Sequence, residues 1–173
     1  EVRNCFIARL INGRRMRLVT VDESQIEMRM AAHISRSPKM IEILSQPEYL
    51  PNGKKNKMAD LHIRTAMAVF HIPAEDVHEL RHRYPMKRAG FGILYLITED
   101  GLCLQLNAPY AQDPSAPHVW TPEEVKDTVI DPWYGEYPEV RGMQDLDRWR
   151  MLRYGMVWDE FGRTRLIPEA KSS

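Results

Sequence analysis

The spacing of apolar residues along the chain changes near residue 22. Residues 18–21 (Leu-Val-Thr-Val) are rich in β-branched side chains, which is typical of a strand. Downstream of this run, Ile26, Met30 and Ile34 recur every four residues, which places them on one face of a helix. The pattern therefore predicts a strand that leads into a helix.

Asp22 lies at the junction of this predicted strand and helix. Ser24 is expected to cap the helix, and Glu27, three residues later, completes a capping box. A carboxylate at a strand end, beside the unpaired N–H groups of a helix, can reach a metal ion or a ligand. Spacing alone favours the simpler interpretation, in which Asp22 is an ordinary turn residue.

Two hairpins are predicted, one toward each end of the chain. Residues 5–8 and 17–21 are β-rich and flank Asn12 and Gly13, a pair that is the strongest short hairpin signal. Residues 156–158 and 163–167 flank Asp-Glu-Phe-Gly in the same way. Antiparallel pairing of the first two runs would make residues 18–22 part of a sheet.

The chain between these hairpins has mainly helical periodicity. Helices are expected over residues 39–45, 59–70 and 83–95, from Thr121 to a break or kink at Pro132, and then up to about Tyr154. The polar segment 47–57 is expected to be a solvated loop. In the last helix, Trp149 and Leu152 are expected to be core residues.

Composition limits the class of protein. The 173 residues are 43% hydrophobic and 28% charged, which is ordinary for a soluble globular domain. No apolar run is long enough for a membrane span, and two isolated cysteines, Cys5 and Cys103, favour a reducing compartment. The 24 basic and 24 acidic residues cancel, so any basic surface for nucleic acid must be local.

The helix predicted over residues 83–95 presents a candidate binding face. Two cations and two aromatic rings share one broad side of it, namely Arg83, Lys87, Phe91 and Tyr95. This face suits a nucleoside triphosphate, because the cations can bind phosphates and the rings can pack against sugar and base. Pattern alone favours an amphipathic helix with solvated cations. Pro85 is tolerated only in a first turn, so the helix should begin near Arg83.

Several phrases of the sequence resemble conserved motifs of one family. Residues 22–29 read D-E-S-Q-I-E-M-R and residues 32–35 read A-H-I-S. This run resembles the first conserved motif of the family A DNA polymerases, usually D-Y-S-Q-I-E-L-R followed by A-H-L-S. Residues 60–70 are similar to the family's D-I-H-x-x-T-A-x-x-V-F phrase, residues 83–95 to R-x-x-x-K-x-x-x-F-G-x-x-Y-G, and residues 161–168 to F-G-R-R-R-x-x-P. The departures include Glu23 for tyrosine, Leu96 for glycine and Thr164 for the middle arginine.

The resemblance implies template-directed DNA synthesis, in which a nucleotide is transferred from a dNTP to a primer 3′-hydroxyl by a two-metal mechanism. Asp22 is implied as the catalytic metal ligand, assisted by the backbone carbonyl of Glu23, and the cofactor as two Mg²⁺ ions. The family's second aspartate belongs to an H-D-E motif that this sequence does not contain. The second ion is therefore expected to be shared with an aspartate that lies elsewhere.

The resemblance also implies roles for other residues. Glu27 is expected to crowd the 2′ position of the sugar. His62, which pattern alone places at the surface, is expected near the phosphates. The residues implied to bind the nucleotide are Ser24, Gln25, Ile26, Glu27, His62, Arg83, Lys87, Phe91 and Tyr95, and those implied to bind DNA are Arg163 and Arg165.

The expected fold is α+β, a partial polymerase palm with an antiparallel sheet plus a helical fingers subdomain. Residues 1–36 are expected to form the palm portion with the first catalytic motif, 37–135 the fingers, and 136–173 the return to the palm with a terminal hairpin. Expected partners are primer-template DNA, dNTP and another polypeptide that carries the H-D-E motif and thumb, in the cytoplasm of a bacterial or phage-infected cell and away from membranes. The alternative is a non-catalytic DNA-binding or scaffold subunit that retains the polymerase fold, which the departures at Glu23 and Leu96 favour.

Overall fold

The computed structural model describes residues 7–108 and 119–170 of the chain. Its helices and strands are β1 (Leu10–Ile11), β2 (Arg14–Arg15), α1 (Ile26–Ser35), α2 (Pro38–Leu44), α3 (Leu61–Phe70), α4 (Tyr84–Leu94), α5 (Glu99–Asn107), α6 (Pro122–Val125), α7 (Asp131–Glu136), α8 (Pro138–Tyr154), β3 (Met156–Trp158) and β4 (Thr164–Leu166). The π-helical turns η3 (Glu79–Arg83) and η5 (Lys126–Ile130) precede α4 and α7. Short 3₁₀ turns lie at η2 (Lys57–Ala59) and η6 (Pro168–Ala170).

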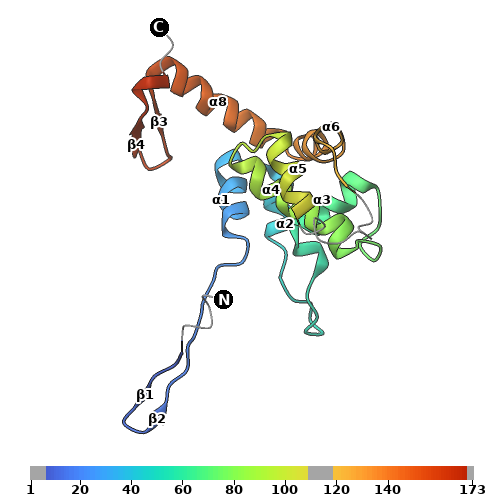
Figure 1. Cartoon of the computed structure of the whole chain (residues 1–173), viewed down its shortest axis with the longest axis vertical. Coiled ribbons are helices and arrows are strands. Elements are labelled where there is room, and N and C mark those ends of the chain that lie inside the picture. Colours follow the sequence, from blue (N-terminus) through green and yellow to red (C-terminus); the bar gives the residue numbers. More distant parts are fainter. Residues whose placement is uncertain (1–6, 109–118, 171–173) are drawn as a thin grey trace.

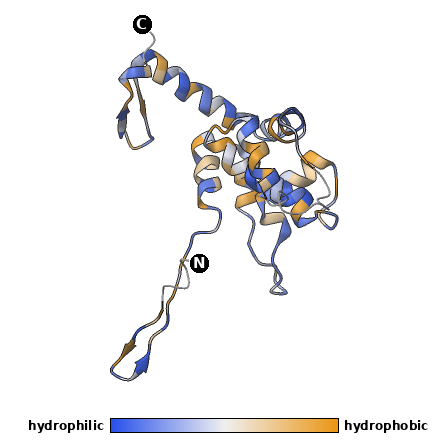
Figure 2. Ribbon diagram, in the orientation of Figure 1, coloured by the Kyte–Doolittle hydropathy of each residue, from blue (hydrophilic) through white to orange (hydrophobic). Residues whose placement is uncertain are grey.

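Helices α1 to α7 pack together into a body, from which the first hairpin and the far end of α8 project (Figure 1). Apolar residues are concentrated where these helices meet (Figure 2). The largest fully buried side chains include Met28 of α1, Met86 of α4 and Trp133 of α7. In this interior the hydroxyls of Thr65 and Tyr137 lie 2.7 Å apart and form a hydrogen bond. Burial of this apolar surface is the main stabilising contribution to the body.

The first hairpin has the predicted turn. Leu10 pairs with Arg15 and Ile11 with Arg14 in antiparallel register. Asn12 and Gly13 have φ angles of 50° and 74°, the left-handed values that a type I′ turn requires. The β1–β2 pair is exposed and lies at the end of an arm that extends away from the helices (Figure 1).

The strand predicted over residues 18–22 is wrong. Within residues 7–108 and 119–170, this segment pairs with no other strand, and the exposed fractions of Val19 and Val21 are 81% and 90%. β-Branched residues favour an extended backbone, but a strand also needs a neighbour that accepts and donates ladder hydrogen bonds. The predicted strand over residues 5–8 lies partly outside the described residues.

The predicted capping box at the start of α1 is also wrong. Gln25 precedes the helix in a left-handed conformation (φ 54°, ψ 34°), and no side chain caps the helix. The Gln25 side chain instead contacts the start of α3, where its Nε2 donates to the carbonyl of Ala59 (3.4 Å) and its Oε1 accepts from the amide of Leu61 (3.3 Å). Tertiary hydrogen bonds therefore determine how the chain enters α1.

Helix α4 begins at Tyr84, one residue from the predicted start, and ends in a Schellman motif. The amide of Leu96 donates to the carbonyl of Ile93 (3.0 Å), and that of Ile97 donates to the carbonyl of Gly92 (2.9 Å). Leu96 has a φ of 56°, a conformation that favours glycine. An added Cβ on Gly92 would lie 2.6 Å from Cγ2 of Ile97, so the return of the chain over α4 requires glycine there.

The C-terminal part has the predicted order of elements. Thr121 Oγ1 accepts from the amide of Glu124 (3.2 Å) at the start of α6. The π-helical turn η5 comes directly before α7, which has Pro132 in its first turn, so the predicted irregularity at this proline takes the form of a widened turn. Strands β3 and β4 pair antiparallel, with Val157 opposite Arg165.

The prediction that Trp149 and Leu152 are core residues is wrong. Their exposed fractions are 53% and 41%, because α8 runs outward beyond the helical body (Figure 1). Near its start, Ser37 Oγ donates to Glu139 Oε2 (2.9 Å), and Lys39 and Glu136 form an ion pair, so α2 is joined to α7 and α8. The subdomain boundaries at residues 36 and 136 stay predictions.

The predicted α+β class is confirmed. The strands of the described ranges form two separate antiparallel pairs, β1–β2 and β3–β4, and not one sheet. No helix in the described residues is both long and apolar enough to cross a lipid bilayer.

Candidate functional site

A pocket of about 320 Å³ lies where the segment before α1, the start of α3 and helix α4 meet. Its lining combines carboxylates, cations and the rings of His62 and Phe91, from parts of the chain that are far apart in sequence. The lining residues are Asp22, Glu23, Ser24, Gln25, Ile26, Glu27, Lys55, Asp60, His62, Arg83, Lys87 and Phe91. All predicted nucleotide-binding residues except Tyr95 are among them.

The backbone shortly after Asp22 is held by hydrogen bonds at Ser24 and Gln25. Gln25 contacts α3 as described above, and Arg29 of α1 donates from Nε to the carbonyl of Ser24 (3.1 Å). The Arg29 guanidinium also donates to the carbonyl of Leu44 at the end of α2 (2.7 Å). Asp22 and Glu23 themselves are exposed, so both can meet a solute at the pocket wall.

Asp60 is a pocket residue that the sequence predictions missed. Its Oδ1 accepts from the amides of His62 (3.0 Å) and Ile63 (3.3 Å), so it caps α3. Its Oδ2 accepts from both Nε (3.1 Å) and Nη2 (2.8 Å) of Arg83, an ion pair in which two N–H groups of the fork share one oxygen. Two sequence signals included Asp60, its place before a helical run, which is a capping pattern, and its place as the first residue of the phrase similar to D-I-H-x-x-T-A-x-x-V-F, but neither assigned it to the site. Lys55 was missed because it lies in a polar loop.

The Asp60–Arg83 pair is nearly shielded from water. The exposed fractions of the two side chains are 8% and 20%. Burial by itself would raise the pKa of the Asp60 carboxyl, but the hydrogen bond and positive charge of Arg83 outweigh burial and lower this pKa. Burial likewise opposes the charge on Arg83, yet Asp60 and Glu79 raise the pKa of the guanidinium. Both groups are therefore charged.

His62 is buried, with an exposed fraction of 4%, so the interpretation of His62 as a surface residue is wrong. Its ring lies 5.7 Å from that of Phe91, measured between centroids. Burial lowers the pKa of His62 to about 4, and the positive charges of Arg83 and Lys87 act in the same direction against the opposing Asp60. The imidazole is therefore neutral at neutral pH.

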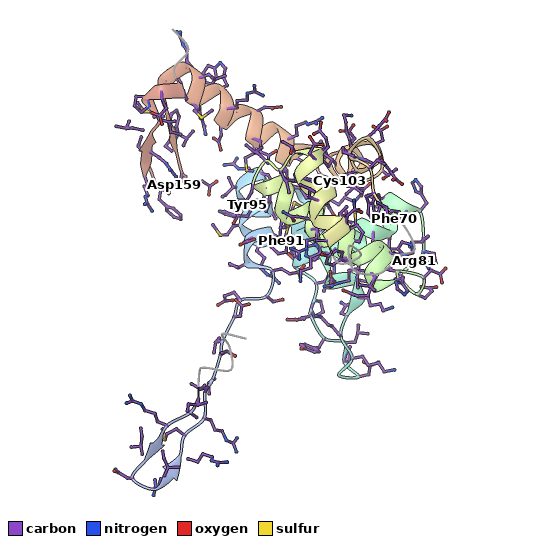
Figure 3. All side chains as sticks on the ribbon, in the orientation of Figure 1. Phe70, Arg81, Phe91, Tyr95, Cys103 and Asp159 are labelled. Atoms are coloured by element: carbon purple, nitrogen blue, oxygen red, sulfur yellow. The ribbon has the colours of Figure 1, made fainter. Side chains whose placement is uncertain are left out.

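The remaining predicted residues of α4 extend the site toward α1. Phe91 lies in the last turn of α4 and Tyr95 directly follows the helix, both near α1 (Figure 3). The hydroxyl of Tyr95 donates to Oε1 of Glu27 on α1 at 3.3 Å, which connects Tyr95 to the pocket although it does not line it. Lys87 is exposed at the pocket, so its ammonium is available to an anion.

The predicted DNA-binding arginines lie elsewhere. Arg163 immediately precedes β4 and Arg165 lies within it, both are exposed, and neither lines the pocket. A larger hollow of about 780 Å³ lies between α1, α8 and the β3–β4 hairpin. It contains no predicted nucleotide-binding residue, so the smaller pocket is the better candidate site.

The pocket offers oxygen donors of the kind that Mg²⁺ prefers. These are the carboxylate of Asp22 and the backbone carbonyl of Glu23. Residues 7–108 and 119–170 contain no group of three or more acidic, histidine or cysteine side chains placed to hold a metal ion. The donors of this chain thus fit part of a magnesium site, which needs further oxygen ligands.

Comparison with known proteins finds relatives of this chain. The chain is 31% identical over 176 residues to DNA polymerase I of Mycobacterium leprae, an alignment that covers 100% of this chain and 16% of the relative. It is 29% identical over 155 residues to the thermostable DNA polymerase I of Thermus aquaticus, covering 90% of this chain and 16% of the relative. The chain thus spans about one sixth of the length of these relatives.

A solved structure and a family model also match this chain. A structure described as the POL domain of Pol1 from M. smegmatis, in complex with DNA primer-template and dNTP, is similar with a TM-score of 0.64 and 29% identity. The similarity covers 88% of this chain and 22% of that one. The model of the family "DNA polymerase family A" matches residues 1–173. Because this match extends over the whole sequence, the chain belongs to DNA polymerase family A.

Proposed function

We propose that this chain supplies the nucleotide-binding part of a DNA-directed DNA polymerase, which transfers nucleotides from dNTPs to a primer 3′-hydroxyl. One observation carries the proposal: a single pocket contains Asp22, whose carboxylate can bind a metal ion, together with Arg83 and Lys87, whose cationic groups can bind phosphates. Membership of DNA polymerase family A and the similarity to a solved polymerase domain in complex with primer-template and dNTP support it.

The triphosphate would bind along the cationic wall of the pocket. Arg83 keeps N–H groups beyond those that Asp60 and Glu79 occupy, and Lys87 is exposed. Neutral His62 can donate one ring N–H to a phosphate oxygen without adding charge. Phosphate contacts of this kind neutralise the charge that develops in phosphoryl transfer and hold the reacting atoms in place.

The sugar would lie between α1 and α4. Phe91 offers a ring for stacking, and the Glu27–Tyr95 hydrogen bond holds the Glu27 carboxylate at the wall of the pocket. We propose that Glu27 crowds the 2′ position of the incoming nucleotide and so disfavours ribonucleotides. Ser24, Gln25 and Ile26 complete this wall, and Arg163 and Arg165 would contact phosphates of the primer-template.

Asp22 and the Glu23 carbonyl would hold Mg²⁺, which supplies charge stabilisation and activates the attacking hydroxyl when bound. A two-metal arrangement needs more carboxylates than these, and the sequence contains no H-D-E phrase. We propose that the second aspartate comes from polypeptide outside these 173 residues, either in the same longer protein or in a separate subunit.

Replacement of Asp22 by asparagine tests this proposal. Asp22→Asn should reduce nucleotide incorporation by the complete enzyme by a factor on the order of 10³ or more, because it removes a charged ligand that acts in the transition state. Primer-template binding and thermal stability should stay close to wild type, since Asp22 is exposed. The matched control is Asp145→Asn, an exposed acid on α8 outside the pocket.

The same experiment distinguishes the alternative, a DNA-binding or scaffold subunit without catalysis. Glu23 and Leu96, which depart from the family's usual residues, favour that alternative. Incorporation by Asp22→Asn within a few-fold of wild type would show that Asp22 is not a metal ligand. If the wild-type complex binds primer-template but incorporates nothing with any divalent ion, the scaffold role is correct.

A further inference from the structure

Asp60 and Arg83 form a shielded ion pair at the pocket, with side-chain exposed fractions of 8% and 20%. The two carboxylate oxygens of Asp60 have separate partners. Oδ1 accepts from two amides at the start of α3, and Oδ2 accepts from Nε and Nη2 of Arg83. The Asp60 carboxylate thus connects the backbone of α3 to the guanidinium of Arg83, the last residue of η3.

We propose that Asp60 is a positioning residue that fixes the orientation of the Arg83 guanidinium for the terminal phosphates of the incoming nucleotide. This inference rests on the proposed function and deepens it. The forked contact restricts rotation of the guanidinium, because Nε and Nη2 on one edge of the group both donate to the same oxygen, Oδ2. An arginine held in this way loses less conformational entropy when a phosphate binds.

The second carboxylate partner of Arg83, Glu79, is much more exposed to solvent than Asp60. Glu79 Oε1 accepts from Nη1 at 2.8 Å, but the side chain of Glu79 is 64% exposed, against 8% for Asp60. Exposed pairs at a spacing of four residues on a helix contribute little, since water and salt screen them. A phosphate can therefore replace Glu79 on Nη1, while Asp60 stays on the opposite edge of the guanidinium.

The lining of the pocket agrees with different roles for Asp60 and Glu79. Asp60 and Arg83 both line the pocket, and Glu79 does not. Asp60 is also anchored by the fixed backbone of α3, whose start is held in turn by Gln25 from the segment next to Asp22. The orientation of Arg83 is thereby tied to the backbone that carries the proposed metal ligand.

The test compares Asp60→Asn with Glu79→Gln in the complete enzyme by steady-state incorporation kinetics. Asparagine keeps the oxygen that caps α3 but presents an amide to the guanidinium, so the cap survives and the fork is lost. We expect Asp60→Asn to raise the KM for dNTP by a factor on the order of ten, with a smaller change in kcat. Glu79→Gln should stay within about twofold of wild type.

The double variant Asp60→Asn/Arg83→Gln shows whether Asp60 acts through Arg83. Arg83→Gln should raise the KM for dNTP, and adding Asp60→Asn should change it by less than about twofold further. Equal effects of Asp60→Asn in both backgrounds, or an unchanged KM in a folded Asp60→Asn protein, would overturn the positioning role. If Arg83→Gln leaves the KM unchanged, the proposed phosphate contact itself fails, which is a separate result.

A second variant covers the case in which Asp60→Asn does not fold. Asp60→Ser keeps a good capping side chain but is too short to form the fork with Arg83. It should fold with a melting temperature below that of wild type, because the Arg83 guanidinium loses a shielded partner, and its KM for dNTP should match the rise expected for Asp60→Asn. A wild-type KM in this variant would contradict the proposal.

Discussion

Burial of His62 should make the folded state sensitive to mild acid. Its pKa is lowered to about 4 in the folded chain, mainly by burial, whereas an exposed histidine has a pKa of about 6.5. Between these two values the unfolded chain binds a proton that the folded chain does not. The free energy of unfolding should therefore fall as the pH decreases from about 6.5 toward 4, and change no further from this group below that.

The size of the effect follows from the two pKa values. A separation of about 2.5 units corresponds to a maximum of roughly 3 kcal/mol, of which about 2 kcal/mol should already be lost at pH 5. Asp60 adds to acid sensitivity only at lower pH, because its pKa is lowered from 3.8. Between about pH 6.5 and 4, His62 therefore contributes more than Asp60 to the pH dependence of the free energy of unfolding.

Urea denaturation of wild type and His62→Gln at pH values from 7.5 to 4.5 measures the effect. Glutamine does not titrate, so the difference between the two free energies of unfolding isolates the histidine contribution. We expect wild type to lose about 2 kcal/mol more than His62→Gln between pH 7.5 and 5. A difference that stays constant across this range would show that His62 protonates freely in the folded chain and would refute the burial argument.

Two further predictions concern the turn after α4 and the wall of the pocket between α1 and α4. Leu96→Gly should stabilise the fold by about 1 kcal/mol, because Leu96 has a φ of 56° in the Schellman motif and is 69% exposed, so strain is relieved and little packing is lost. Thermal unfolding measures the gain, with Leu96→Ala, which keeps the strain, as the control. A glycine variant no more stable than the alanine variant would contradict the strain argument. Glu27→Ala should raise ribonucleotide use relative to deoxynucleotide use, and Phe91→Tyr, which adds a hydroxyl where a 3′-hydroxyl is missing, should improve the use of chain terminators. Incorporation ratios measured with competing substrates test both effects. Unchanged ratios in the two variants would show that the sugar does not bind at this face of the pocket.

The sequence alone determined most of the helices, both hairpin turns and the family. Helical periodicity, a capping threonine and first-turn prolines depend on interactions within a few residues, so Thr121, Pro122 and the Asn12–Gly13 turn could be recognised without tertiary information. The face shared by Arg83, Lys87 and Phe91 was predictable for the same reason, because helical spacing fixes it. The motifs resembling family A DNA polymerases supplied the other predicted site residues, but not Asp60 or Lys55.

Tertiary structure decided how those residues are held and which predicted elements exist. The strand over residues 18–22 depends on a neighbouring strand that no local pattern can supply, and Gln25 replaces Ser24 at the start of α1 because its partners lie 34 and 36 residues away. Trp149 is exposed because α8 leaves the body, a direction that periodicity does not encode. The burial of His62 and the fork between Asp60 and Arg83, which lie 23 residues apart, arise only when α3 and α4 pack together. Local spacing therefore fixed the chemical groups of the site, whereas packing fixed their charge states and orientations.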